Sequence, residues 1–399
     1  MKNKILETYI YYLLIFSPVV DTITGIITYY ISNIGISILY KSFIIILIIV
    51  HIVLKKNLNF LLLLISFILL MVIKFFFQTN NLSVELMWII KIFFFMMVFD
   101  FLKKTINNNW RKINFYFKLL IATIVFNLLG GFLFGYGYDA YKGANLGSVG
   151  FYVAPNEMGG LLVVGASYLA IIFIHKKSPI KYILMFSFVL LTASVTIMKA
   201  SILGVFLVFL FVPFIYLYSN TKNFKAPKWI LIMIIIFLVL LLLTIPLLFD
   251  YIYITLDAKH RLDYALSHGV VSGFLSHRDV WATQMMTYYV DNINVYNFLF
   301  GYAYEIALRL FGNRSEIDIV DILFSYGFFG LFLIYGFWIR LLYLLWRIDS
   351  IFSPFILFSA ILIFFLSLTS GHIINSGLGA IPFAMLFSMA YLKDHTVKR

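Results

Sequence analysis

Side chains that could bind or transform a substrate gather in two stretches of an otherwise apolar chain. The stretch from about Asp250 to Asp321 holds most of them, and a shorter stretch surrounds Gly371 and His372. An arginine fork can grip two phosphate oxygens at once, whereas an imidazole or a carboxylate can accept a proton near neutral pH. These residue types together predict a site that holds an anionic group beside a general base.

The first candidate group is Ser276-His277-Arg278-Asp279. Arg278 is our main candidate for binding phosphate oxygens, and His277 and Asp279 are further candidates in the same turn. The alternative is a solvated, charged turn that precedes a helix, with Asp279 close to the helix N-terminus.

The second candidate group begins at Arg314 and places the carboxylates of Glu316, Asp318 and Asp321 at the start of an apolar run. An acid inside such a run is costly unless it is paired. Ser315 followed by Asp318 also resembles a helix capping box, so a structural role stays open. Glu316 and Asp318 could hold a divalent cation through their oxygens, but we expect no metal and no cofactor.

His372 lies among the small residues Ser370, Gly371, Ser376 and Gly377, which would leave room for a ligand. Histidine suits proton transfer near neutral pH, although a lone histidine in an apolar region often only packs.

Three isolated positions complete the candidates. Asn156 follows Pro155 at the start of an apolar run, a pattern typical of a helix N-terminus. Lys199 lies in a tight turn between two apolar runs, where it could assist an arginine or merely anchor the interface. Asp21 lies within the first apolar run, and an ionisable residue there normally faces the bundle interior or a cavity.

The elements that position these residues are predicted to be membrane-spanning helices. The 399-residue chain is 63% hydrophobic with a mean hydropathy of +1.00, and apolar runs long enough to cross a bilayer recur along it. We therefore predict an all-α, polytopic membrane protein. The chain has no cysteine, which excludes disulfides and thiolate chemistry. The predicted spans are 9–31, 36–54, 59–77, 84–102, 113–135, 155–175, 181–198, 200–218, 229–249, 318–339, 353–370 and 377–392.

The distribution of basic residues predicts the orientation. With the N-terminus inside, 19 of the 30 Lys and Arg residues fall in inner segments, seven in outer segments and four within spans. Because inner loops carry an excess of positive charge, both termini are expected to be cytoplasmic. Residues 1–249 would then form a nine-span bundle, 250–317 a large extracytoplasmic loop, and 318–399 three spans that complete the same domain. Helical patterns at Arg278–Tyr289 and Tyr302–Leu310 predict short amphipathic helices in the loop.

Four short stretches resemble motifs of the bacterial O-antigen polymerase and O-antigen ligase family, which includes the Wzy-like capsule and exopolysaccharide polymerases. They are FSPVVDTITG at 16–25, APNEMGG at 154–160, TIMKAS at 196–201 and EIDIVDILFSYGFFG at 316–330. Lys199 replaces the arginine that many members carry in the third stretch, a departure that weakens the transfer of its role. The architecture of many spans with one large, late outer loop is also similar.

The resemblance implies a glycosyltransferase that joins undecaprenyl-diphosphate-linked oligosaccharide repeat units on the outer face of the cell membrane and releases undecaprenyl diphosphate. On this reading Arg278 would bind the diphosphate, with help from Arg314 and Lys199. His372 would be the base, with Glu316 as second choice and Asp318 orienting the acceptor. A chain-length regulator and a flippase would be possible partners, and no nucleic acid is expected.

Three alternatives remain open from sequence. A ligase would use the same donor with another acceptor, and a transporter or flippase would move the same lipid-linked oligosaccharide. A transporter often has two related halves, which this chain does not show. The third alternative is a lipid-binding scaffold. The sequence indicates neither the sugar, the linkage and its anomeric outcome, nor the oligomeric state.

Overall fold

The computed structural model describes residues 2–32, 35–78, 82–106, 109–141, 146–220, 267, 275, 278–312 and 314–392. The predicted span 229–249 and the candidate His277 lie outside these residues. Within them the chain is an all-α membrane-type bundle, as the sequence predicts, with one small hairpin added.

Every other predicted span coincides with a helix, because long apolar runs without proline or glycine clusters favour helices in a bilayer. These helices are α1 (Lys2–Tyr30), α2 (Ile36–Leu54), α3 (Leu58–Gln78), α4 (Leu82–Thr105), α5 (Trp110–Val125), α7 (Pro155–His175), α8 (Pro179–Ser194), α9 (Lys199–Asn220), α16 (Asp318–Arg347), α17 (Ser353–Ser370) and α18 (Ala380–Ser388). The π-helix η1 (Phe126–Gly130) and α6 (Gly131–Phe134) continue α5, and the 3₁₀ helix η2 (Met389–Tyr391) continues α18. In the described part of the chain, seven helices are long and apolar enough to cross a membrane.

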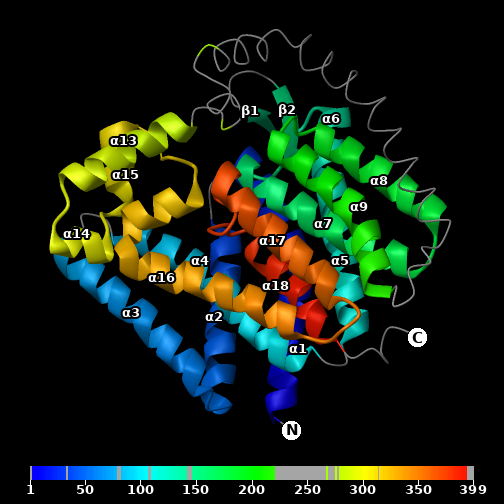
Figure 1. Ribbon diagram of the computed structural model, residues 1–399, viewed down its shortest axis with the longest axis horizontal. Coiled ribbons are helices and arrows are strands. Elements are labelled where there is room, and N and C mark those ends of the chain that lie inside the picture. The colour runs from blue at the N-terminus through cyan, green and yellow to red at the C-terminus, as the bar shows by residue number, and fades with distance from the viewer. Residues whose placement is uncertain are drawn as a thin grey trace.

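The helices pack as one bundle around α7 and α18, both of which are buried along most of their length. α7 packs on α8, α9 and α17, whereas α18 packs mainly on α4. Figure 1 shows α13, α15 and the β1–β2 hairpin at one end of the bundle and the start of α1 at the other. The end that carries α13 is the one predicted to face outward.

A two-stranded antiparallel hairpin interrupts the helical pattern between α6 and α7. It pairs β1 (Tyr138–Tyr141) with β2 (Leu146–Gly150), and these are the only strands in the described residues. The Ser148 amide donates to the Val195 carbonyl at 2.9 Å, which joins the hairpin to the turn before α9. The sequence analysis did not predict this hairpin.

Three short helices form the described part of the outer loop: α13 (Arg278–Asp291), α14 (Val295–Phe300) and α15 (Tyr304–Phe311). They enclose a small core of their own, made with α16 from Met285, Tyr289, Tyr302, Ala307 and Phe324. Burial raises the pKa of Tyr289 to about 12, so its hydroxyl stays neutral and donates to two carbonyls of α14. Within the helix predicted at Arg278–Tyr289, Met285 enters this core fully, and Tyr289 is more buried than Tyr288.

Helix α16 is broken at Gly327, whose φ of 61° and ψ of −165° suit only glycine. Its backbone lies against that of Gly301, and a Cβ on Gly327 would come within 2.5 Å of the Gly301 nitrogen. The buried Lys74 of α3 donates to the Tyr302 carbonyl at 2.6 Å and to the Ser325 carbonyl. The break thus ties the outer helices to α16, because one ammonium satisfies carbonyls of both segments.

Candidate functional site

An ion pair between Arg278 and Glu316 joins the outer helices to the start of α16. Arg278 begins α13, and its Nε and Nη2 donate to one oxygen, Glu316 Oε2, at 3.1 and 2.9 Å. Its Nη1 donates to the Thr369 carbonyl at the end of α17 at 3.3 Å. The side chains are 17% and 33% exposed, so a ligand could reach both from the end of the bundle that carries α13.

Glu316, Gly371 and His372 meet backbone to backbone. A Cβ on Gly371 would overlap the carbonyl of Glu316, so only glycine fits there. Glu316 and His372 both have positive φ, 55° and 57°, although neither is glycine. Such backbone strain persists where the surroundings impose it, and it often marks functional sites. The two residues, 56 positions apart in the chain, therefore lie beside each other.

Asp318 maintains the turn that carries His372. Its Oδ1 accepts the His372 amide at 2.7 Å, and its Oδ2 accepts the Ile373 and Ile374 amides at 3.0 and 2.9 Å. The residue is fully buried. Asp318 therefore cannot orient an acceptor by direct contact, as the sequence analysis expected, and it positions His372 instead.

The APNEMGG stretch contributes two adjacent residues at the start of α7. Asn156 Nδ2 donates to Glu316 Oε2 at 3.3 Å, which brings this candidate to the ion pair. Glu157 is buried, and its Oε2 accepts from Ser376 Oγ at 2.6 Å and from the Leu378 amide at 2.8 Å. The sequence analysis did not single out Glu157, which fixes the segment that follows His372.

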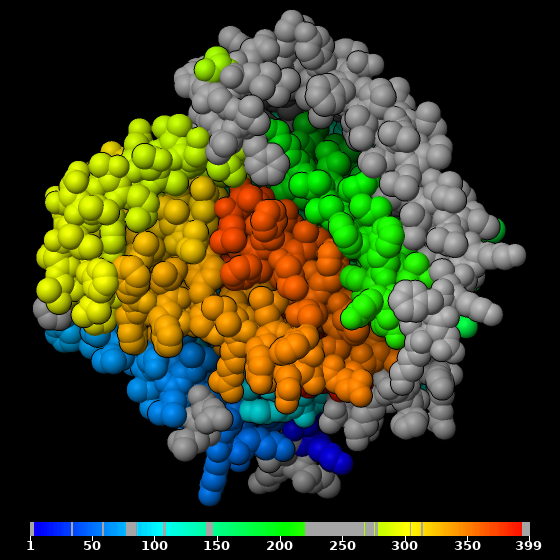
Figure 2. Space-filling view, viewed as in Figure 1, coloured from blue at the N-terminus to red at the C-terminus, as the bar shows by residue number. Residues whose placement is uncertain are grey.

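Lys199, the first residue of α9, lies close enough to Arg278 for their positive charges to interact. It follows a turn in which Ile197 has a φ of 56°, an uncommon value for a β-branched residue. The TIMKAS stretch thus supplies a second cation at the same end of the bundle. In Figure 2, yellow-green α13 lies on one side of orange-red α17, and green α9 packs on the other side of α17.

Arg314 and Asp321 do not face the Arg278–Glu316 pair. Arg314 is 5% exposed, and its Nη2 donates to Ser325 Oγ at 2.7 Å and to the Asp321 carbonyl at 3.3 Å. Asp321 is fully buried, and its Oδ1 accepts from the Ser315 amide and hydroxyl at 3.1 and 2.7 Å. Both candidates therefore hold the entry to α16, and the expected help of Arg314 to Arg278 has no geometric support.

Trp88 on α4 packs beside His372, and the sequence analysis missed this contact. Its ring lies 5.8 Å from the His372 ring, centroid to centroid, and 5.3 Å from the Arg314 guanidinium carbon. Lys91, one turn further along α4, lies over the same ring at 4.4 Å. An aromatic face attracts cations and orients a neighbouring imidazole. One tryptophan in an apolar run gives no signal from which this contact could be predicted.

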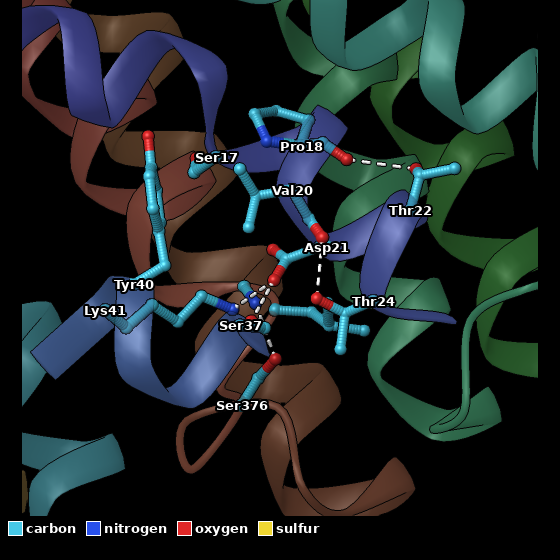
Figure 3. Close-up of polar contacts among 12 residues, drawn as sticks. Ser17, Pro18, Val20, Asp21, Thr22, Thr24, Ser37, Tyr40, Lys41 and Ser376 are labelled. Atoms are coloured by element: carbon cyan, nitrogen blue, oxygen red, sulfur yellow. Dashed lines mark hydrogen bonds and ion pairs between the residues drawn. The ribbon is translucent and has the colours of Figure 1, made fainter. Parts of the chain in front are cut away.

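The remaining candidates form no hydrogen bond with the ion pair in the described part of the chain, or lie outside it. Asp279 is half-buried, and no donor in the described chain contacts its Oδ1. Asp21 accepts from Lys41 Nζ at 2.6 Å and from Ser37 Oγ, and Figure 3 shows its carboxylate between these two side chains of α2. Asp21 thus has a partner on the neighbouring helix, as an acid inside a membrane span requires.

The donor set at Glu316 and Asp318 does not suit a divalent cation. Three amides occupy the Asp318 carboxylate, and Arg278 and Asn156 occupy Glu316 Oε2. Among the described residues, no group of three or more His, Asp or Glu side chains has a metal-binding arrangement. Glu316 contacts Arg278, so an anion that competes for this arginine could bind here.

Comparisons of the chain with protein-family models, with curated proteins and with solved structures gave no match.

Proposed function

We propose that the protein is a polysaccharide polymerase that joins undecaprenyl-diphosphate-linked oligosaccharides on the outer face of the cell membrane. The observation that carries the proposal is the Arg278–Glu316 pair beside His372, at the end of the bundle predicted to face outward. The pair offers an arginine fork for phosphate, and the imidazole and the carboxylate are candidate bases.

In the proposed reaction, a hydroxyl at the non-reducing end of one repeat unit attacks C1 of the sugar at the reducing end of another chain. The bond between C1 and the diphosphate oxygen breaks, and the electron pair leaves with undecaprenyl diphosphate. The base takes the hydroxyl proton. Because a diphosphate is a good leaving group, the enzyme mainly has to balance its developing negative charge.

The residues divide these tasks according to their exposure. Arg278, with Lys199 near it, would bind the diphosphate. In the structure, Glu316 Oε2 occupies the arginine fork, as a phosphate oxygen would. An arriving diphosphate would take this place and release Glu316. His372 is the first candidate for the base, because Asp318 and Trp88 fix its position, and the released Glu316 is the second.

The test is to delete the gene in its host and to measure the size of the surface glycan. A polymerase predicts a ladder that collapses to single repeat units and that returns when the intact gene is supplied. Full-length chains left on the lipid carrier would instead indicate a ligase, which uses the same donor. Unchanged glycan would exclude both, and a repeat unit trapped on the inner face would indicate a flippase.

A further inference from the structure

A second polar site lies at the opposite end of the bundle from Arg278. A hollow of about 450 Å³ opens between α1, α2 and the end of α4. Lys104, on its wall, lies 16 residues after Trp88 on the same helix, a separation of roughly 24 Å along the axis. The hollow is thus remote from the candidate active site, and the proposed reaction does not use it.

The acids at this hollow are held by fixed partners. Glu7 Oε1 lies 3.1 Å from His51 Nε2 and 3.5 Å from Lys55 Nζ, and His51 is buried beneath it. Asp100 Oδ2 accepts from Lys104 Nζ and from Asn57 Nδ2, both at 2.8 Å. The carboxylates therefore orient the walls of the hollow.

The lysines leave an excess of positive charge. Lys55, Lys56 and Lys104 all line the hollow. Glu7 pairs with Lys55 and Asp100 pairs with Lys104, so the excess charge is that of Lys56. Lys56 is exposed, and its ammonium has no carboxylate within 4.0 Å among the described residues. An incoming anion could therefore bind Lys56 without breaking an existing ion pair.

An exposed apolar surface adjoins the hollow. On the last turns of α2, Val50, Val53 and Leu54 are 43%, 54% and 55% exposed, and Ile5 on α1 is 51% exposed. In a helix that spans a membrane, such residues contact acyl chains. A cationic hollow beside this surface matches a molecule with a phosphate head and apolar tails.

We propose that this hollow binds the phosphate of an anionic phospholipid whose acyl chains lie along α1 and α2. Basic pockets between spans on the cytoplasmic side suit anionic headgroups, and the basic residues place this end of the bundle inside. Free phosphate shares the headgroup chemistry but lacks the tails. The apolar surface beside the hollow favours the lipid.

The chain contains a matched control for the alternative that these lysines only set topology. Lys55 and Lys56 directly follow α2, and Lys176 and Lys177 directly follow α7 with the same backbone turn. Lys56 and Lys177 have φ values of 49° and 50°, and both are exposed. Only the first pair lines the hollow. The same Lys→Gln substitution in each pair therefore distinguishes a specific binding site from a general attraction between lysines and anionic lipid.

The experiment measures lipid binding to the purified full-length protein by native mass spectrometry and by thermal shift. Phosphatidylglycerol is compared with phosphatidylcholine and with glycerol phosphate. We expect phosphatidylglycerol to bind and stabilise the wild type most strongly. Lys56→Gln should weaken this binding about fivefold, because each lysine near an anionic lipid strengthens binding by about a factor of five. The double variant Lys55→Gln/Lys56→Gln should weaken it at least about tenfold. Lys177→Gln and the Lys176/Lys177 double variant should bind as the wild type does.

Three results would overturn the proposal. Equal losses at the two lysine pairs would show that charge attracts the lipid without a site. Equal binding of phosphatidylcholine would remove the preference for an anion, and equal stabilisation by glycerol phosphate would identify a soluble phosphate as the ligand. Lys56→Gln changes one exposed side chain, so this variant should fold. Lipid binding is measured on the purified protein, so its outcome does not depend on whether the protein is a polymerase.

Discussion

Arg278 is the residue whose chemistry can be tested most directly. It contacts Glu316 through two of its nitrogens and Thr369 through the third, a planar arrangement that one lysine ammonium cannot reproduce. The same three nitrogens would face the diphosphate in the proposed reaction. Loss of the fork would therefore remove the connection of α13 to α17 and, in the proposed reaction, the charge that would stabilise the leaving group.

We predict that Arg278→Ala lowers polymer formation by about 10²–10³-fold, the loss typical of a preorganised donor to a developing negative charge. Arg278→Lys should recover little of it. Polymer length and turnover would be measured in membranes with matched protein levels. Arg309→Ala is the control, because Arg309 is exposed on α15 and forms no ion pair with a described residue. Full activity of Arg278→Lys would reduce the role of Arg278 to general electrostatics.

At the scale of elements, the broken helix α16 carries the site. Its first segment contains Asp318, and the break at Gly327 receives the backbone of Gly301. The Tyr302 amide donates to the Phe324 carbonyl at 2.7 Å, and Lys74 binds carbonyls on both sides. These contacts therefore join the start of α16 to α14 and α15.

This arrangement gives opposite predictions for two glycines of one helix. Gly327→Ala should destabilise the protein by about 3 kcal/mol or more, because the backbone there is open only to glycine and a Cβ would strike the Gly301 backbone. Gly336→Ala should stabilise it by about 0.5–1 kcal/mol, since no atom lies within 4 Å of the added Cβ and alanine favours the helix.

The measurement is the apparent melting temperature of both variants, purified in the same detergent. Gly327→Ala should melt several degrees below the wild type and Gly336→Ala at or slightly above it. A wild-type melting temperature for Gly327→Ala would show that α16 is continuous. A matching loss in Lys74→Met, which leaves the Ser325 and Tyr302 carbonyls without their buried donor, would link the break to the lysine.

Across the whole molecule, the helices were predictable and their interruptions were not. Apolar runs predicted the spans because a bilayer leaves few alternatives to a helix. The break at Gly327 lies inside such a run, where one glycine does not distinguish a kink from close packing. The hairpin at 138–150 depends on its contact with Val195, far away in the sequence.

Some residues of the candidate site could likewise be predicted from the sequence, and others could not. Charged residues at the ends of spans indicated Arg278, Glu316 and His372, and the structure brings these three together. The partners of Asp318 are backbone amides, which leave no signature in residue types. Asp318, Asp321 and Arg314 therefore appeared to be site residues, whereas Trp88 and Glu157 did not.

The orientation of the molecule rests on its basic residues and has a direct test. The segments predicted to lie inside carry 19 of the 30 Lys and Arg residues, including the lysines of the proposed lipid site. If this distribution sets the topology, the turn after α13 faces outward and the turn between α16 and α17 faces inward. The exposed residues Asn292 and Asp349 lie in these turns and are suitable reporters.

Because the chain has no cysteine, a single cysteine at either position is the only thiol that can be labelled. In intact cells, an impermeant thiol reagent should label Asn292→Cys and leave Asp349→Cys unlabelled. Both should react once the membrane is opened, which controls for exposure of the thiol. The reverse pattern would place Arg278 and His372 on the cytoplasmic side. A polymerase that acts on a lipid carrier at the outer face would then be excluded, and the lysine hollow would face outward.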